Sequence, residues 1–363
     1  MTKKTKTIQA TINQQTVRVN PGTTILEAAR LAGIHIPSLC YRKDLGPLTS
    51  CMVCIVEIRG FENLVPACTA PTEDGMVIET ESDRILTARR TALELLLSEH
   101  TGDCIAPCQK ACPFHIDIPS MIRRIQQGDP AAASHVVSVA LSGPETGCER
   151  QCEKACRRNR YDEAVAIRRL GGFLTNETGC PGLLKGAVGD QDSDNHGPDD
   201  GRRFNSVMRK ITEDELDIFI RNSGREKQVR PKNPGTGYDV SEARRESLRC
   251  LHCDCRNKDG CSLRECAGIF QAQQTRYPGE RTGFEQHVFK DYIFEPGKCI
   301  KCGICTRISE QKGLPYGFSF LKRGFDTRVG VPFNRFENPE LLKIIGLLVE
   351  NCPTGALVAN DGT

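Results

Sequence analysis

The first residues of the chain alternate between apolar and polar side chains. Apolar residues stand at every second position from Ile8 to Ile12, and again at Val17 and Val19. A period of two is typical of strands that bury one face, so two such runs in succession predict a hairpin. The proline and glycine that follow predict a turn.

A short helix is predicted next. Thr24, with Glu27 three residues later, makes a capping box for a helix that begins at Ile25, and Gly33 ends the helix after Ala32. Two strands, a helix and then a cysteine-containing loop is the element order of a β-grasp ferredoxin.

Further along the chain, apolar residues recur with the period of a helix. The segments with this pattern are 84–99, 118–127, 130–141 and 162–170, followed by a capped helix from Thr212 to about Asn222 and a basic helix that begins near Ser241. Two other segments, 186–203 and 223–240, are polar and rich in residues that favour turns, and we interpret them as loops or linkers.

Cysteine is the residue type that most changes this picture. The chain has 363 residues, of which 20 are Cys, while hydrophobic residues make up 38% and Trp is absent. That share is below the usual value of roughly 45–50%, so a single large apolar core is not expected. Bonds between metals and thiolates can supply the missing stability.

Disulfides and metal sites are the two explanations for so many cysteines. Disulfide scaffolds are usually small secreted domains, whereas this chain is long and its first residues lack the apolar segment of a signal peptide. No membrane span is expected either, because the longest apolar stretch, Leu341 to Val349, contains Lys343 and is far shorter than about 20 residues. We therefore expect a cytoplasmic protein whose thiols bind metals.

The charge of the chain gives little support to a nucleic-acid partner. The formal net charge is +3, spread along the chain, and no stripe of Lys and Arg interleaved with aromatic residues is present. Short basic runs such as Arg202-Arg203 are interpreted as solvated surface.

The first cysteine zone holds four residues: Cys40, Cys51, Cys54 and Cys68. Ten, two and thirteen residues separate them. A long gap, a Cys-x-x-Cys pair and a distant fourth Cys are typical of plant-type 2Fe–2S ferredoxins. A structural zinc site is the alternative, but such sites favour two Cys-x-x-Cys pairs and only one is present.

Residues 7–104 contain the segments TTILEAARLAGIHIPSLCY, LTSCMVCIVEI, LVPAC and RRTALELLLSEHTGDC. In these segments the chain resembles the N-terminal region of the large iron–sulfur subunit of respiratory complex I, a region shared by iron-only hydrogenases and NAD-dependent formate dehydrogenases. The resemblance implies a 2Fe–2S cluster on the four cysteines of the first zone. In this family a helix delivers a His ligand to a 4Fe–4S cluster, and His100, which three residues separate from Cys104, matches it.

The spacing after His100 departs from that family. Three residues separate each of Cys104, Cys108 and Cys112, where the family has two and then five. For His100, a surface position at the end of a helix is the alternative to ligation.

From Cys104 onward a second resemblance begins. The segments CIAPCQKACPFHIDIPSMIRRIQQGDPAAA and CERQCEKACRRNRYDEAVAIRRL resemble the helical iron–sulfur domain of glutamate synthase small subunits and dihydropyrimidine dehydrogenases. That family implies two 4Fe–4S clusters with interleaved ligands. One would take His100, Cys104, Cys108 and Cys156, and the other Cys112, Cys148, Cys152 and, as the fourth ligand, Cys180. The first segment has fewer cysteines than the family's, so a single cluster on His100 and the first triad stays an alternative.

The middle zone places five cysteines within seventeen residues: Cys250, Cys253, Cys255, Cys261 and Cys266. The segment is polar and without an apolar pattern, so we interpret it as a metal knot that holds structural zinc or a 4Fe–4S cluster. Zinc is slightly preferred because the segment is small and local. His252 is interpreted as a bystander between ligands.

The last zone contains three cysteines at two-residue gaps and a fourth that precedes a proline: Cys299, Cys302, Cys305 and Cys352. This is half of a bacterial two-cluster ferredoxin. The positions where a second triad would fall are apolar: Leu342, Ile345 and Leu348. Since Ser309 also stands in place of the first Cys-Pro, one 4Fe–4S cluster is predicted, with zinc as the alternative.

Some motifs are absent from the sequence. No dinucleotide-binding glycine motif follows a predicted strand, and no P-loop is present. We therefore expect no catalytic residues and no flavin or NAD(P) site on this chain. The expected cofactors are one 2Fe–2S cluster and two or three 4Fe–4S clusters, or four if the middle zone holds one instead of zinc.

The two resemblances together imply a function and its partners. We expect a non-catalytic iron–sulfur electron-transfer subunit of a multi-subunit NAD(P)H-linked oxidoreductase, with electron bifurcation as one possible activity of the assembly. Its partners would be a flavoprotein subunit, of FMN/NADH or FAD/NADPH type, and another redox subunit. A cluster-based redox or iron sensor and a zinc-rich scaffold protein are the alternatives.

The expected fold class is α+β and multidomain. The predicted parts are a β-grasp 2Fe–2S domain (1–83), a helical iron–sulfur domain (84–185), a linker with a short helix (186–240), the metal knot (241–280) and a small ferredoxin-like 4Fe–4S domain (281–363).

Overall fold

The computed structural model describes residues 7–138, 149–178, 203–278 and 282–360. The chain divides into two compact units, each built from separate stretches of sequence. Unit 1 comprises Met1–His100, Asp259–Thr282 and Pro296–Leu357, and unit 2 comprises Thr101–Lys258, Gly283–Glu295 and Val358–Thr363. The five-part division expected from the sequence stays a prediction.

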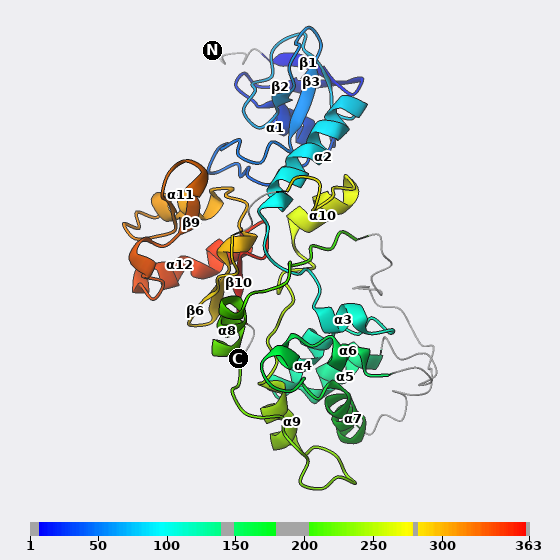
Figure 1. The fold of residues 1–363 in the computed structure, drawn as a ribbon. Helices are drawn as coiled ribbons and strands as arrows, with labels where there is room; N and C mark the ends of the chain where they lie inside the picture. Colours follow the sequence, from blue (N-terminus) through cyan, green and yellow to red (C-terminus); the bar gives the residue numbers. More distant parts are fainter. Residues whose placement is uncertain (1–6, 139–148, 179–202, 279–281, 361–363) are drawn as a thin grey trace. The chain divides into compact units, whose positions relative to one another are not determined.

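Unit 1 begins with a five-stranded mixed sheet in the order β2-β1-β5-β3-β4 (Figure 1). Its elements are β1 (Ile8–Ile12), β2 (Gln15–Val19), α1 (Ile25–Leu31), β3 (Ile55–Ile58), β4 (Val65–Pro66) and β5 (Val77–Glu79). The predicted hairpin is present, with Ile8 paired to Val19, and β1 continues the sheet by pairing in parallel with β5. The side chain of Thr24 accepts the amide of Glu27, as the capping pattern predicted.

Further helices and a hairpin complete the description of unit 1: α2 (Asp83–Ser98), α10 (Ser262–Ile269), α11 (Ile304–Gln311), β8 (Ser319–Leu321), β9 (Arg328–Gly330) and α12 (Pro339–Glu350). Helix α2 leads from the sheet to His100 (Figure 1). Helix α12 buries Leu341, Ile345 and Leu348 completely. Two of the three apolar positions predicted to replace a second cysteine triad therefore lie in a hydrocarbon core.

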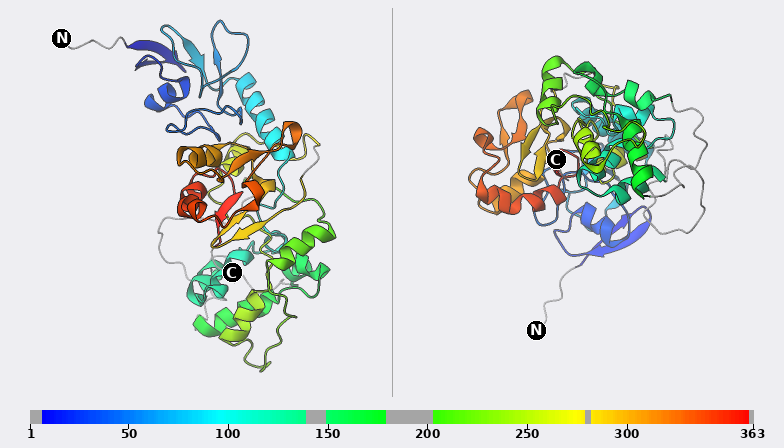
Figure 2. Two further views of the ribbon diagram at one scale, coloured as in Figure 1. Left: turned by 90° about the vertical axis from the view of Figure 1, so that its left-hand side faces the viewer. Right: turned by 90° about the horizontal axis from the view of Figure 1, so that it is seen from below.

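Unit 2 is mainly helical (Figure 1, and in two further views in Figure 2). Its elements are α3 (Pro107–Ala111), α4 (Ile118–Gln126), α5 (Pro130–Ser138), α6 (Gln151–Lys154), α7 (Ile167–Thr178), α8 (Glu213–Arg221), α9 (Val240–Ser247), β6 (His287–Phe289) and β7 (Tyr292–Phe294). One apolar core lies among α4, α5, α6, α7 and α9, and a second, smaller apolar cluster contains residues of α8. A last strand, β10 (Leu357–Ala359), borders β7. The capping box predicted at Thr212 is present.

The helix expected over 162–170 begins only at Ile167. The carbonyls of Glu163 and Ala164 accept hydrogen bonds from the guanidinium of Arg249, at 2.8 and 3.1 Å. The amides of Ile167 and Arg168, four residues later, donate instead to the carbonyl of Val165 at 2.8 Å and to Oε1 of Glu153 at 2.9 Å, so the segment stays irregular. Other hydrogen bonds thus replace those of the expected helix.

Within the described residues, no helix combines the length and the apolar character needed to cross a bilayer.

Candidate metal centres

The cysteines of the described residues carry free thiols. Twelve of them fall into three groups of four. We call these set A (Cys40, Cys51, Cys54, Cys68), set B (Cys108, Cys156, Cys250, Cys253) and set C (Cys299, Cys302, Cys305, Cys352). Sets A and C lie in unit 1, and set B lies in unit 2.

Set A is assembled by the sheet of unit 1. Cys54 precedes β3 and Cys68 follows β4, and the antiparallel pairing of these strands brings the two thiols together. A hydrogen bond from Cys68 lowers the pKa of Cys54, and one from Cys51 lowers the pKa of Cys40. All four side chains are buried.

The donor set of set A fits a 2Fe–2S cluster, which four Cys thiolates hold. The loop that carries Cys40 and Cys51 is tightly wound, because Thr49 and Met52 both adopt left-handed backbone conformations, with φ of 58° and 53°. Such a conformation is costly for a residue with a side chain and persists where the surrounding structure requires it. Both cysteines of this loop are buried.

Arg89 of α2 is a buried cation beside set A. Its side chain is 3% exposed, and its Nη2 donates to the carbonyl of Ile55, the residue after Cys54, at 2.9 Å. The Cys54 thiolate is the charge that most raises the pKa of Arg89, although burial lowers that pKa overall. Arginine remains protonated in proteins, so this positive charge persists.

Substitution of Arg89 by Gln is expected to lower the reduction potential of a cluster held by set A. A buried positive charge favours the more negative, reduced state, and its loss should shift the equilibrium about tenfold, or roughly 59 mV for one electron. The measurement is a redox titration followed by electron paramagnetic resonance. Arg89→Lys should keep most of the wild-type potential.

Arg84 provides the control for this prediction. It lies on the same helix, but its side chain is 55% exposed. Arg84→Gln is expected to leave the potential unchanged, because solvent screens an exposed charge. Equal shifts in the two Gln variants would contradict a specific role for Arg89.

Set C lies at the start of α11 and the end of α12. Burial raises the pKa of Cys299 to about 12 and also raises the pKa of Cys302 and Cys305. The charge of Cys352 contributes to all three shifts, so the fourth cysteine lies near the triad, and ligation of one cluster by all four stays a prediction. Four thiols fit the 4Fe–4S ligand set.

Sets A and C are neighbours within unit 1. The charge of Cys40 is among the causes that raise the pKa of Cys302. Arg307 of α11 connects their loops. Its Nη2 donates to the carbonyl of Cys40 at 3.0 Å and its Nη1 to the carbonyl of Gly46 at 2.5 Å, both in the loop of set A. Its Nε donates to the carbonyl of Gly303, in the loop of set C, at 3.3 Å.

Gly303 allows the close approach of the two loops. Its φ is +69°, and a Cβ atom there would lie 2.5 Å from Cδ2 of Leu48. A side chain at this position would therefore force the Leu48 side chain to move and would strain the left-handed backbone of Gly303.

Set B combines cysteines from three distant stretches of the chain. Burial raises the pKa of all four thiols, that of Cys250 to about 12. The charges of Cys156, Cys250 and Cys253 add to the shift at Cys108. The sequence prediction placed Cys108 and Cys156 with His100 and Cys104, and Cys250 and Cys253 in a separate knot, so the structure groups these residues differently.

The Cys-x-x-Cys turns of sets B and C have the same local geometry. The third residue is left-handed in both, with φ of 45° at His252 and 54° at Lys301. In both turns its amide donates to the sulfur of the first cysteine at 3.4 Å. His252 thus contributes its backbone to the turn.

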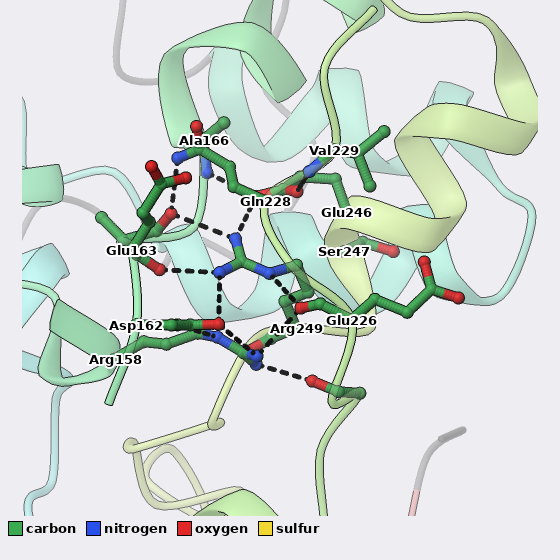
Figure 3. Close-up of polar contacts among 12 residues, drawn as sticks. Arg158, Asp162, Glu163, Ala166, Glu226, Gln228, Val229, Glu246, Ser247 and Arg249 are labelled. Atoms are coloured by element: carbon green, nitrogen blue, oxygen red, sulfur yellow. Dashed lines mark hydrogen bonds and ion pairs between the residues drawn. The ribbon is translucent and has the colours of Figure 1, made fainter. Parts of the chain in front are cut away.

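A buried network of arginines and carboxylates joins the stretches that carry set B (Figure 3). Arg158 and Arg249 are both fully buried, and Nη1 of Arg158 donates to the carbonyl of Arg249 at 2.6 Å. Asp162 pairs with both guanidinium groups. Because Arg158 is two residues after Cys156 and Arg249 directly precedes Cys250, the network fixes these two thiols relative to each other.

Glu246 completes the network from α9. Its carboxylate is buried and accepts hydrogen bonds from the amides of Ala166 and Val229, at 2.8 and 2.7 Å, and from Nη1 of Arg249 at 2.8 Å. A buried charge is tolerated only when it is paired and hydrogen-bonded in this way.

A cavity of about 280 Å³ lies beside set B, and Cys250 and His252 are among its lining residues. The imidazole Nε2 of His252 lies 3.2 Å from Oε1 of Gln126. Burial lowers the pKa of His252 to about 3, so the ring is neutral. Its side chain is thus bound to Gln126, and a bystander role remains the prediction for it.

The other predicted ligands are placed as follows. His100 follows the end of α2, as expected from the sequence. The sulfur of Cys104 accepts the amide of Ser206 at 3.2 Å, and its carbonyl accepts the amide of Cys255. Cys112 and Cys152 lie in the helical core of unit 2. Cys148 and Cys180 lie outside the described residues.

The five cysteines of the middle zone are divided between the two units. Cys250, Cys253 and Cys255 belong to unit 2, and Cys261 and Cys266 belong to unit 1. Burial raises the pKa of Cys266 to about 11, and Arg89 lowers it. In the described part of the chain, no three His, Cys, Asp or Glu side chains are placed to hold a single metal ion.

Sequence reasoning missed four arginines that organise these sites. Each donates to backbone carbonyls near candidate cysteine ligands: Arg89, Arg158, Arg249 and Arg307. A weak signal existed in two places, because the sequence reads Cys-Arg-Arg at 156–158 and Arg-Cys at 249–250. Such adjacency does not show which carbonyls an arginine reaches.

Two family models match the chain. Residues 5–83 match a model described as a 2Fe–2S iron–sulfur cluster binding domain, and residues 98–180 match the dihydropyrimidine dehydrogenase domain II, 4Fe–4S cluster. The chain therefore contains a 2Fe–2S domain and a 4Fe–4S domain in an α+β fold. These matches confirm the predicted fold class and its two iron–sulfur domain types.

Curated relatives match parts of the chain. The HndD subunit of the NADP-reducing hydrogenase of Solidesulfovibrio fructosivorans is 49% identical over 107 residues, 28% of this chain and 18% of the relative. A subunit of the NADH-quinone oxidoreductase of Rhizobium meliloti is 45% identical over 187 residues, 49% of this chain and 22% of the relative. The alpha subunit of the NADPH-Fe(3+) oxidoreductase of Geobacter sulfurreducens is 40% identical over 97 residues, 27% and 12% of the two chains.

The chain thus spans between 12% and 22% of the length of these relatives. They confirm the resemblance to subunits of hydrogenases and NADH-linked oxidoreductases. A solved structure of NAD+-reducing NiFe-hydrogenase in the H2-reduced state aligns with 97% of this chain and 87% of that chain, at 16% identity and a TM-score of 0.46.

Proposed function

We propose that this chain, which contains a 2Fe–2S domain and a 4Fe–4S domain, is an electron-transfer subunit of an NAD(P)H-linked oxidoreductase. It would relay single electrons between a flavin subunit and another redox subunit. The names of its relatives support this proposal, because each names a subunit of an NADH-, NADPH- or NADP-linked system. The observation that carries it is the gathering of twelve thiols into three sets of four.

We assign the 2Fe–2S cluster to set A and one 4Fe–4S cluster each to sets B and C. The assignment of set B replaces the grouping with His100 and Cys104 that the sequence suggested. The shared turn geometry of sets B and C supports the same kind of cluster in both. The remaining predicted ligands stay candidates for further metal sites: His100, Cys104, Cys112, Cys148, Cys152, Cys180, Cys255, Cys261 and Cys266.

When bound, such clusters accept and release one electron at a time, while flavins exchange electron pairs as hydride. The residues of this chain determine the environment of the clusters. The set A cysteines and Cys302 are buried, which limits the access of water to them. Arg89 places a positive charge beside set A, and Arg307 holds the loops of sets A and C together.

A flavoprotein partner, of FMN/NADH or FAD/NADPH type, is part of the proposal, since no flavin or nucleotide motif was found in the sequence. We place the protein in the cytoplasm. Free thiols in such number are typical of a reducing compartment. A redox or iron sensor and a zinc-rich scaffold remain the competing functions.

Metal analysis of the anaerobically purified protein tests the proposal. Sets A, B and C predict about ten irons per chain, and about fourteen if the remaining candidates hold a third 4Fe–4S cluster. On reduction, electron paramagnetic resonance signals of both cluster types should appear. Fewer than about six irons together with stoichiometric zinc would favour the scaffold and end the proposal. Oxidation of NADH or NADPH coupled to cluster reduction, once a flavoprotein partner is added, would separate a relay from a sensor.

A further inference from the structure

Aromatic side chains project into solvent around the hairpin of β8 and β9 in unit 1. Phe325 at the hairpin tip is 107% exposed, and Phe333 after β9 is 82% exposed. Phe320 of β8 is 44% exposed. Clustered exposure of large apolar residues is unusual on a soluble surface and marks sites of interaction.

The same surface is basic. Lys322, Arg323 and Arg335 are exposed, and none of the three forms an ion pair within the described part of the chain. The guanidinium of Arg335 lies 5.8 Å from the ring centre of Phe333 and 5.1 Å from that of Tyr316. The acidic residue of the hairpin, Asp326, only partly offsets these charges. We call Phe320, Lys322, Arg323, Phe325, Phe333 and Arg335 the hairpin face.

The hairpin face is attached directly to the loop of set C. Gly303 follows Cys302, and a Cβ atom at Gly303 would lie 3.3 Å from Cζ of Phe320. The inner edge of Phe320 therefore covers the cysteine loop, while its outer part reaches solvent. A protein bound to this face would lie close to set C.

We propose that the hairpin face is the docking surface for an acidic redox protein, which exchanges electrons at set C. The inference rests on the proposed function and adds to it the place and the chemistry of one partner. Aromatic and arginine side chains dominate the energetics of protein interfaces. Unpaired basic groups attract an acidic partner and speed its association. A nucleic acid would also meet basic and aromatic groups, but contact with the cysteine loop favours a redox partner.

The test uses the full protein with its clusters and, as the probe, a reduced plant-type ferredoxin, which is a small acidic electron donor. Stopped-flow absorbance measures the rate at which the ferredoxin is oxidised. For the wild-type protein the rate should fall as salt is added, because ions screen the attraction. The double variant Lys322→Glu/Arg323→Glu should react at least tenfold more slowly at low salt.

Phe325→Ser separates apolar contact from charge. It is expected to slow the reaction several-fold and to leave its salt dependence unchanged. The matched control is Arg209→Glu/Lys210→Glu, a pair of adjacent exposed basic residues in unit 2. This control should react like the wild type if the effect is local to the hairpin face.

Three outcomes would overturn the inference. The hairpin variants could react as fast as the wild type, or the control pair could slow the reaction equally, which would show only a general charge effect. The wild type could also fail to react with the ferredoxin although dithionite reduces its clusters. Each of these results leaves the proposed function standing, whereas absence of iron from the purified wild type would defeat that function first.

Discussion

Replacement of Cys253 by alanine is expected to remove about four irons per chain, because a 4Fe–4S cluster needs four ligands and set B contains no spare thiol. Cys156→Ala should remove the same four irons, although 96 residues lie between the two positions. The double variant should then lose no more iron than either single variant. Such non-additivity is the signature of residues that act in one site.

The grouping suggested by the sequence predicts a different result. With Cys156 in a cluster and Cys253 in a zinc knot, one variant would lose iron, the other would lose zinc, and the double variant would lose both. Iron, zinc and acid-labile sulfide, measured on anaerobically purified protein, separate the two cases. Cys266→Ala is the control, since Cys266 lies in unit 1 and is expected to leave the iron of set B in place. Loss of the same metal from Cys266→Ala and Cys253→Ala would support the knot instead.

Glu246→Ala is expected to be the most destabilising substitution in unit 2 that does not alter a cysteine. The carboxylate is fully buried, and its removal leaves the Arg249 guanidinium and two amides without this partner. Breaking a buried ion pair from one side costs about 3–5 kcal/mol. This is a large part of a typical stability of about 5–15 kcal/mol.

Thermal unfolding followed by circular dichroism, under anaerobic conditions, measures this effect. At about 2–4 °C per kcal/mol, the midpoint should fall by roughly 6–20 °C. Iron should also be lost from set B, because the network that positions Cys156 and Cys250 is broken. An unfolding midpoint within a degree of the wild-type value would show that the network contributes little to the stability of unit 2.

Glu226→Ala is the matched control for Glu246→Ala. The Glu226 side chain pairs with Arg245 at the surface, where the two side chains are 54% and 53% exposed. Exposed pairs contribute little, so a change within about 0.5 kcal/mol is expected. The backbone carbonyl of Glu226, which accepts Nε of Arg249 at 3.0 Å, is retained in this variant.

The sequence by itself determined the local elements and predicted two candidate metal sites from local spacing. Alternating apolar residues produced β1 and β2, and the Thr24 and Thr212 caps are where their patterns placed them. The sequence also grouped the cysteines of sets A and C, because a Cys-x-x-Cys pair fixes its own turn, and cluster binding by these two sets stays a prediction. The apolar replacement of the missing second triad was visible at Ile345 and Leu348, which are buried.

Only the tertiary structure decided the composition of set B. Cys108, Cys156 and Cys250 come from distant stretches, and no local spacing shows which of many cysteines meet. Their convergence depends on Arg158 and Arg249, whose guanidiniums bind carbonyls and carboxylates far away in sequence. The helix expected before Ile167 is likewise replaced by other hydrogen bonds, such as that from the amide of Arg168 to Glu153. Hydrophobic periodicity records which face of an element is buried, whereas the partners of a buried charge are fixed only once the chain has folded around it.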